Sequence, residues 1–299
     1  MYKKITKAVI PAAGFGTRML PFTKAVPKEL IPLVDKPVIE YVVKEAVDSG
    51  LNDILLILSA GKEAILNHFK PVPDLEKRLQ QSGKPQMLKL INPFDSDLRI
   101  SCIYQEELNG LGGAVKLAEE FVQDDFFAVL LGDTVLDSTS KTAVTGQLID
   151  AHYQTGNPVI AVEQLPREEL GKYGCVGGEW ISDTIMQVNA MVEKPLPHEI
   201  PGEFAVASRY LLSPEIFPLL KNTVPGKGGE IQLTDAIKQL IPSGKLNACR
   251  IAGRRYDLGC RSGFIAANLE FAMRDPDLLR EIKNKLARNK IIPESTILK

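Results

Sequence analysis

Short apolar runs alternate with amphipathic stretches through the first third of the chain. The runs predict strands at residues 8–10, 54–58, 100–104 and 126–131. Residues 54–58 are continuously apolar, which is typical of a strand buried on both faces of a parallel sheet. The stretches between the runs predict helices at residues 37–50, 63–69 and 113–121. This β-α-β-α-β alternation predicts an α/β fold with a doubly wound, mostly parallel sheet.

Strands are more closely spaced in the sequence beyond Pro158. They are expected at residues 159–163, 185–193 and 204–212, which indicates a mixed sheet continuing the parallel half rather than a second domain. We therefore expect one domain over residues 1–299, with 262–299 a C-terminal helical segment. Its helices, at 263–274 and 276–288, either pack on the core or form a subunit contact. Residues 72–97, rich in proline and charge, read as a partly helical excursion from the core.

Composition narrows the function classes. The 36 basic and 37 acidic residues give a formal net charge of −1, which provides no support for binding to nucleic acid or a membrane surface. No apolar run approaches the roughly 20 residues that span a bilayer. The four cysteines form no CxxC pair and read as free thiols. We expect a cytoplasmic protein.

The densest chemical signal is a glycine loop directly after the first strand, Pro11-Ala12-Ala13-Gly14-Phe15-Gly16-Thr17-Arg18. Small residues allow backbone amides to approach phosphate oxygens closely. A Rossmann fingerprint needs a glycine where Met19 stands, and a Walker loop needs Gly-Lys-Ser/Thr, which is absent. The loop is therefore a phosphate-binding candidate of a third kind.

Two cations accompany this loop. Arg18 lies within it and Lys28 follows it, and their charges suit a polyphosphate tail. Lys24 lies between them, but its position sets it only slightly apart from an ordinary solvated lysine.

Carboxylates follow two later strands. Asp133 ends an apolar run, where a Mg²⁺ ligand is expected, although a turn-capping role explains the position equally well. Asp257 offers a second carboxylate that could complete a metal site. Glu193 and Lys194 end another strand; they suit sugar hydroxyls and a phosphate, with an exposed ion pair as the alternative.

A protein nucleophile is not indicated. The sequence contains no convincing Ser-His-Asp or Cys-His set, and its three histidines fall in presumed helices or a loop. Displacement at phosphorus needs positioning and charge neutralisation rather than such a nucleophile.

These motifs resemble the bacterial UTP–glucose-1-phosphate uridylyltransferases, within the wider sugar-nucleotide pyrophosphorylase superfamily. The resemblance covers residues 8–271, and its most specific blocks are 11–29, 35–37, 110–112, 193–195 and 229–236. It implies a Rossmann-like nucleotidyltransferase fold. The sequence departs from the family pattern at Gly113, where many relatives have histidine, and at Cys260.

The resemblance also implies residue roles. The nucleotide-binding residues would be Ala12, Ala13, Gly14, Gly16, Lys28, Gln105 and Gly110. The sugar-phosphate-binding residues would be Gly174, Glu193, Lys194, Val206 and Glu230. Asp133 and Asp257 would be the metal ligands, and the catalytic residues would be Arg18, Lys28, Asp133 and Lys194.

The expected reaction is Mg²⁺-dependent in-line transfer of the uridylyl group of UTP to glucose 1-phosphate, which gives UDP-glucose and pyrophosphate. We expect a homodimer or homotetramer. The alternatives are the same chemistry with another NTP or hexose 1-phosphate, and a non-catalytic regulatory paralogue that binds nucleotide sugar. A nucleotide-binding oxidoreductase is disfavoured because the loop lacks the third glycine of the Rossmann fingerprint.

Overall fold

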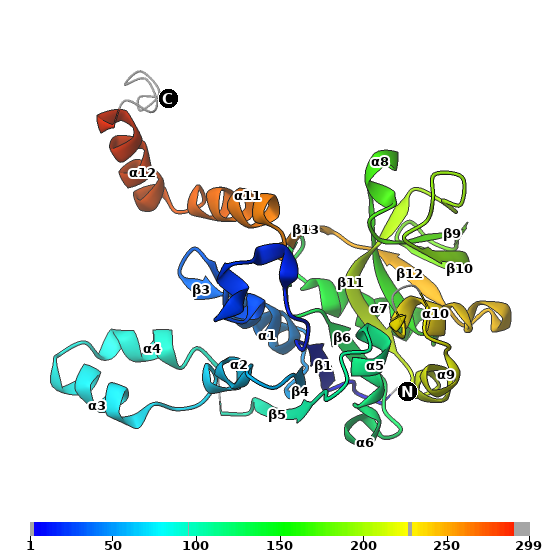
Figure 1. The fold of residues 1–299 in the computed structure, drawn as a ribbon, viewed down its shortest axis with the longest axis horizontal. Helices are drawn as coiled ribbons and strands as arrows, with labels where there is room; N and C mark the ends of the chain where they lie inside the picture. The colour runs from blue at the N-terminus through cyan, green and yellow to red at the C-terminus, as the bar shows by residue number, and fades with distance from the viewer. Residues whose placement is uncertain (1–2, 95, 227–228, 290–299) are drawn as a thin grey trace.

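The computed structural model describes residues 3–94, 96–226 and 229–289 (Figure 1). Residue 95 of the expected excursion and residues 290–299 of the expected C-terminal segment lie outside the described residues. The strands are β1 (Lys7–Pro11), β2 (Pro32–Leu33), β3 (Lys36–Pro37), β4 (Asp53–Leu58), β5 (Arg99–Tyr104), β6 (Phe127–Leu130), β7 (Thr134–Ser138), β8 (Val159–Gln164), β9 (Gly174–Trp180), β10 (Ile185–Glu193), β11 (Phe204–Leu212), β12 (Asn247–Arg250) and β13 (Gly253–Asp257).

The helices fall between and after these strands. They are α1 (Val38–Asp48), α2 (Glu63–Asn67), α3 (Pro73–Gln81), α4 (Leu88–Ile91), α5 (Leu111–Lys116), α6 (Glu119–Val122), α7 (Val144–Thr155), α8 (Arg167–Leu170), α9 (Ile216–Asn222), α10 (Leu233–Lys238), α11 (Arg261–Ala272) and α12 (Pro276–Arg288). The helix expected at 113–121 is two short helices, α5 and α6, that begin two residues earlier.

One large sheet organises the molecule, with strand order β5-β4-β1-β6-β11-β8-β12-β10-β9. Strands β5, β4, β1 and β6 pair in parallel, as the sequence predicts. The other half corrects the expectation of a mostly parallel sheet, because β11, β10 and β9 pair antiparallel with their neighbours and only β8–β12 is parallel. The short connection between β9 and β10 requires an antiparallel pair, since parallel strands need a long crossover. β11 also pairs with β9, so these last strands close on themselves.

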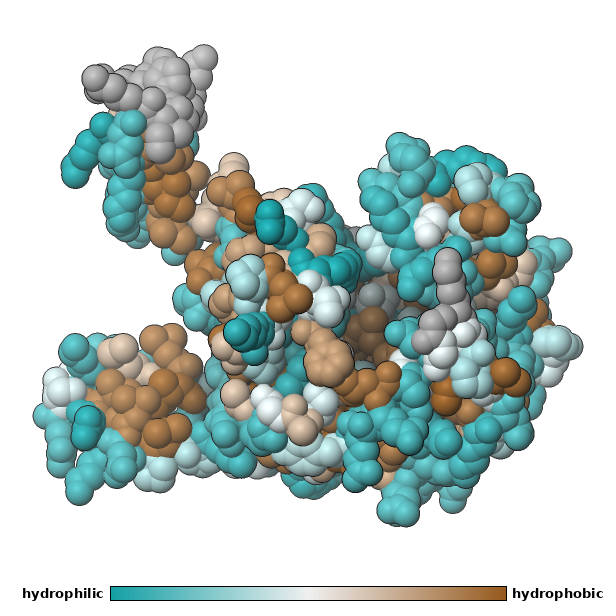
Figure 2. Space-filling model, viewed as in Figure 1, coloured by the Kyte–Doolittle hydropathy of each residue, from teal (hydrophilic) through white to brown (hydrophobic). Residues whose placement is uncertain are grey.

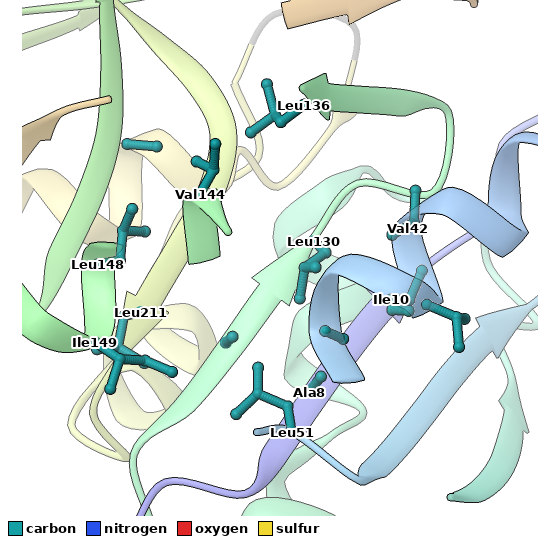
Figure 3. Close-up of a cluster of buried hydrophobic side chains, with 14 of the residues drawn as sticks. Ala8, Ile10, Val42, Leu51, Leu130, Leu136, Val144, Leu148, Ile149 and Leu211 are labelled. Atoms are coloured by element: carbon teal, nitrogen blue, oxygen red, sulfur yellow. The ribbon is translucent and has the colours of Figure 1, made fainter. Parts of the chain in front are cut away.

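Helices cover both faces of the sheet. Successive side chains of a strand point to opposite faces, and β1 shows this directly: Ala8 and Ile10 join one core cluster, and Val9 joins the other. The first cluster packs under α1 and α7, and Figure 3 shows Val42 and Leu148 of these helices on the same side as strand residues such as Leu130. The second packs under α5, α6, α9 and α10. Burial on both faces explains the continuously apolar strands.

Two helical pieces project from this body (Figure 1). The excursion at 72–97 is helical as expected, with α3 and α4 extending away from α2. The C-terminal helices α11 and α12 confirm the expected helices at 263–274 and 276–288. Asp275 caps α12 by accepting hydrogen bonds from the amides of Asp277 and Leu278.

A buried ion pair ties the layers together. Arg209 on β11 is fully buried, and its guanidinium donates to both carboxylate oxygens of Glu45 on α1, at 2.7–3.1 Å. It also donates to the backbone oxygens of Thr134 and Ser208. Thr145, in the first turn of α7, donates through both its amide and its hydroxyl to Glu45. The pair therefore joins α1, α7, β7 and β11.

Replacing Glu45 with alanine should lower the free energy of unfolding by about 3–5 kcal/mol, because Arg209 would remain buried without a counter-charge. Urea denaturation followed by circular dichroism measures the change. Lys44→Ala is the matched control, since Lys44 lies on the same helix in an exposed pair with Asp48 and should cost less than about 1 kcal/mol. Equal losses in both variants would contradict the role given to the buried pair.

Candidate active site

The carboxyl ends of four parallel strands meet at one edge of the sheet. The glycine loop follows β1, Gln105 follows β5, and Gly132 and Asp133 lie just beyond β6. Residues 59–62 follow β4 at the same edge. This is where ligands bind in open α/β sheets.

A cleft of about 490 Å³ lies at this edge. Its walls contain Glu29, most of the glycine loop and all of the residues expected to bind nucleotide. The expected site residues that line it are Ala12, Ala13, Gly14, Gly16, Lys28, Gln105, Gly110, Asp133 and Glu230.

The glycine loop is folded tightly against the segment that follows it. Gly16 has φ 68, a left-handed conformation that favours glycine, and its carbonyl accepts a 2.8 Å hydrogen bond from the hydroxyl of Thr23. A Cβ on Gly16 would lie 3.1 Å from the Cβ of Lys28. The Lys28 ammonium lies 3.8 Å from the point that a Cβ on Gly14 would occupy. The loop thus presents small residues beside a cation.

Lys28 and Asp133 form an ion pair in the cleft, with 2.6 Å between Nζ and Oδ2. Burial disfavours ionisation of Asp133, but Lys28 together with Arg18 and a backbone hydrogen bond holds the pKa of Asp133 below its usual value. Burial likewise opposes the charge on Lys28, and Asp133 together with Glu29 raises the pKa of Lys28 above its usual value. Both groups are charged at neutral pH.

Pairing between β13 and β7 brings Asp257 close to Asp133. Local sequence patterns do not predict this pairing. β13 pairs antiparallel with β7, and the register places Asp257 opposite Thr134, the residue after Asp133. Arg18 bonds to Asp257, with 3.2 Å between its guanidinium nitrogen and Oδ2. One oxygen from each carboxylate lies 3.1 Å from the point that a Cβ on Gly259 would occupy. A guanidinium nitrogen of Arg18 lies closer still, 2.7 Å from the same point, so the absence of a side chain at Gly259 lets Arg18 and both carboxylates approach one another.

These two carboxylates are of the kind that hold a divalent cation. Among the described residues, no three His, Cys, Asp or Glu side chains cluster as a metal site. Mg²⁺ is usually bound by one or two carboxylates, with phosphate oxygens and water completing its shell. Asp133 and Asp257 supply that number of protein ligands.

Gln105 and Gly110, the residues expected to recognise the base, also line the cleft. The side-chain amide of Gln105 donates to the side-chain oxygen of Asn109 at 3.1 Å and to the Gly110 carbonyl at 3.4 Å. A Cβ on Gly113 would lie 1.7 Å from that same Asn109 oxygen. The absence of a side chain at 113 therefore leaves the space that Asn109 fills, and Asn109 in turn holds Gln105.

A smaller pocket of about 140 Å³ adjoins the cleft and shares Leu111 and Leu131 with it. Gly174, Glu193 and Val206, all expected near the sugar, line it. Thr234, at the start of α10, donates a 2.8 Å hydrogen bond to Glu193. A Cβ on Gly174 would approach Glu193 to 3.0 Å, so glycine keeps this carboxylate accessible.

Glu230 lines the cleft, whereas Lys194 lines neither the cleft nor the smaller pocket. The Lys194 side chain is 62% exposed and lies 3.7 Å from Glu193, so its ammonium is only loosely paired. Glu230, expected near the sugar, lies against the base-side loop, where a Cβ on Gly110 would meet the Glu230 Cβ at 2.8 Å. It also lines a third hollow with Glu193 and Lys194. Glu230 therefore lies between the two expected binding regions.

Sequence reasoning missed Lys62, which bonds to the glycine loop from behind. Lys62 is only 7% exposed and Glu29, its ion-pair partner at 2.9 Å, is fully buried. Burial raises the pKa of Glu29 and lowers that of Lys62. The available signal was the position of Lys62 just after β4, at the carboxyl edge.

The chain is similar to known proteins. The nucleotidyl transferase family model matches residues 7–273. A UTP–glucose-1-phosphate uridylyltransferase of Bacillus subtilis is 44% identical over 276 residues, which cover 92% of this chain and 94% of the relative.

Two solved structures are also similar. A UTP-bound UGPase from Acinetobacter baumannii has a TM-score of 0.87 and 35% identity, covering 95% of this chain and 99% of its own. A UDP-glucose pyrophosphorylase complexed with UDP-glucose has a TM-score of 0.82 and 33% identity, covering 91% of this chain and 100% of its own.

Proposed function

The chain belongs to the nucleotidyl transferase family, and we propose that it transfers the uridylyl group of UTP to glucose 1-phosphate, giving UDP-glucose and pyrophosphate. One observation carries the proposal. The cleft lined by the glycine loop, Lys28 and Asp133, with Asp257 close to Asp133, adjoins a pocket lined by Glu193. The relatives that this chain resembles act on, or bind, UTP and UDP-glucose by name.

The nucleotide belongs in the larger cleft and the sugar phosphate in the smaller pocket. Gln105 and Gly110 face the uracil edge, and the amides of Ala12, Ala13 and Gly14 face the nucleoside and its phosphates. Glu193, held by Thr234, is an acceptor for sugar hydroxyls. This placement sets the sugar phosphate beside the α-phosphate of UTP.

The chemistry is an in-line displacement. A phosphate oxygen of glucose 1-phosphate attacks the α-phosphorus of UTP, the bond to the bridging oxygen of the β-phosphate breaks, and pyrophosphate leaves. Lys194 orients the attacking phosphate, and its loose pairing in the structure leaves it able to do so. Arg18 and Lys28 stabilise the charge that grows on the leaving pyrophosphate.

Asp133 and Asp257 would hold a divalent cation, and we expect Mg²⁺. When bound, the ion lowers the repulsion between two anionic reactants. A side chain at residue 259 would crowd both carboxylates, and glycine avoids this.

Two alternatives remain distinct from this proposal. The same residues could serve another NTP or hexose 1-phosphate, because base and sugar selectivity depend on few contacts. A regulatory paralogue would bind nucleotide sugar without turnover. The presence of Arg18, Lys28, Asp133, Lys194 and Asp257 favours catalysis, since a binder has no need of the full set.

We also propose a homodimer or homotetramer, built as one nucleotidyltransferase domain with its C-terminal helices attached, and a cytoplasmic location. Ile265 and Leu269 on α11 and Met273 directly after it are 50–62% exposed and recur every four residues. Figure 2 shows apolar surface on the projecting C-terminal helices and on the projection that contains α3 and α4. No helix in the described ranges has both the length and the apolar character needed to cross a bilayer.

The substrate assignment predicts a preference among nucleotides. With Mg²⁺ and glucose 1-phosphate, pyrophosphate release should be fastest with UTP when each NTP is supplied in turn. A preference for dTTP would contradict the base assignment. No release with any combination of NTP and hexose 1-phosphate would support the regulatory alternative.

Asp133→Asn should reduce turnover by about 100-fold or more while the protein stays folded, because charge stabilisation in the cleft is lost. Removing divalent cations with EDTA should also stop wild-type turnover, and adding Mg²⁺ should restore it. Asp183→Asn is the control, since Asp183 is exposed and its carboxylate forms no ion pair with a described residue. Unchanged turnover in Asp133→Asn would remove this residue from the site.

Light scattering should give a mass of two or four times 32.9 kDa. Leu269→Lys should shift the protein toward the monomer if the exposed stripe of α11 is the subunit contact. A monomeric wild-type protein at assay concentrations would contradict the proposed assembly.

A further inference from the structure

The Lys62 ammonium forms hydrogen bonds with the backbone of the glycine loop, and Lys62 itself does not line the cleft. Its Nζ donates to the carbonyls of Ala12 at 2.7 Å and Gly14 at 2.6 Å. It also donates to both carboxylate oxygens of Glu29, at 3.1 and 2.9 Å. Ala12 and Gly14 line the cleft, but Lys62 does not.

These bonds fix the direction in which the loop amides point. In a trans peptide the N–H points opposite to the C=O, so the amides of Ala13 and Phe15 point away from Lys62. Ser59 fixes the peptide between them by donating a 2.8 Å hydrogen bond to the Ala13 carbonyl. The amides of Ala13, Gly14 and Phe15 donate no hydrogen bond to any described residue. They are donors that a ligand can use.

The Lys62 ammonium also neutralises the buried carboxylate of Glu29. Glu29 is fully buried, yet its side chain belongs to the cleft wall next to Lys28. A carboxylate there would repel phosphate oxygens if it had no partner. Lys62 compensates it, and this leaves Lys28 as the cation that faces the cleft.

We propose that Lys62 is a positioning residue, which orients the loop amides toward the phosphates of UTP and neutralises Glu29 beneath them. The inference rests on the proposed use of UTP. It adds a residue that touches neither substrate and acts on nucleotide binding through the backbone of residues 12–15.

The test is the affinity for UTP of Lys62→Met, measured by calorimetry. Its dissociation constant should rise by about 10- to 100-fold, the equivalent of one lost charge-assisted interaction. In turnover assays the KM for UTP should rise in the same proportion, and the KM for glucose 1-phosphate should stay within about twofold. A purely structural lysine would change both constants together.

Two further variants sharpen the result. Combining Lys62→Met with Glu29→Gln removes the unpaired carboxylate but does not restore the hydrogen bonds to the loop carbonyls. The double variant should therefore recover part of the UTP affinity. This double variant also provides the measurement if the single variant fails to fold. Lys221→Met is the matched control, because Lys221 forms an exposed pair with Glu119, and neither residue belongs to the cleft wall.

Unchanged UTP affinity in a folded Lys62→Met protein would overturn the inference, as would equal losses for UTP and glucose 1-phosphate. Equal UTP affinity in the single and double variants would overturn the role given to Glu29. A wild-type protein that binds UTP without releasing pyrophosphate would overturn the proposed function alone. A wild-type protein that does not bind UTP would overturn both.

Discussion

Parallel hydrogen bonding between β5, β4, β1 and β6 is the constraint on which the site depends. It places the carboxyl ends of all four strands at one edge, so segments far apart in the sequence enter one cleft. The glycine loop, Lys62, Gln105 and Asp133 each follow a different strand of this set. An antiparallel neighbour would present its amino end at this edge and move its exit loop to the opposite one.

The fold was predictable where the signal is local. The apolar strands and α1 follow from composition and periodicity, because burial on both faces demands continuous apolar side chains. β9 was missed because its sequence, Gly-Cys-Val-Gly-Gly-Glu-Trp, reads as a loop. Its glycines have a packing reason instead: a Cβ on Gly178 would lie 2.0 Å from the Gln187 carbonyl of β10. Such close backbone contact is invisible before the partner strand is known.

The same division applies to the candidate site. The glycine loop and Asp133 were recognisable because glycine and a strand exit are signals within a few residues. That Asp257 lies beside Asp133 depends on the β13–β7 register, which no local pattern encodes. Thr234 likewise supports Glu193 from a separate part of the sequence. Long-range pairing therefore determines which of several plausible carboxylates can cooperate.

Lysines show why residue type alone could not assign roles. Lys28, Lys62 and Lys194 carry the same group, but their surroundings differ. Lys28 forms an ion pair with Asp133 at the cleft wall, and Lys194 is largely exposed beside Glu193. Lys62 is buried, and its donors are directed to Glu29 and two loop carbonyls, so it cannot also reach a ligand. Burial and partners, rather than charge, separate the lysines proposed to contact phosphate from the one proposed to position the loop.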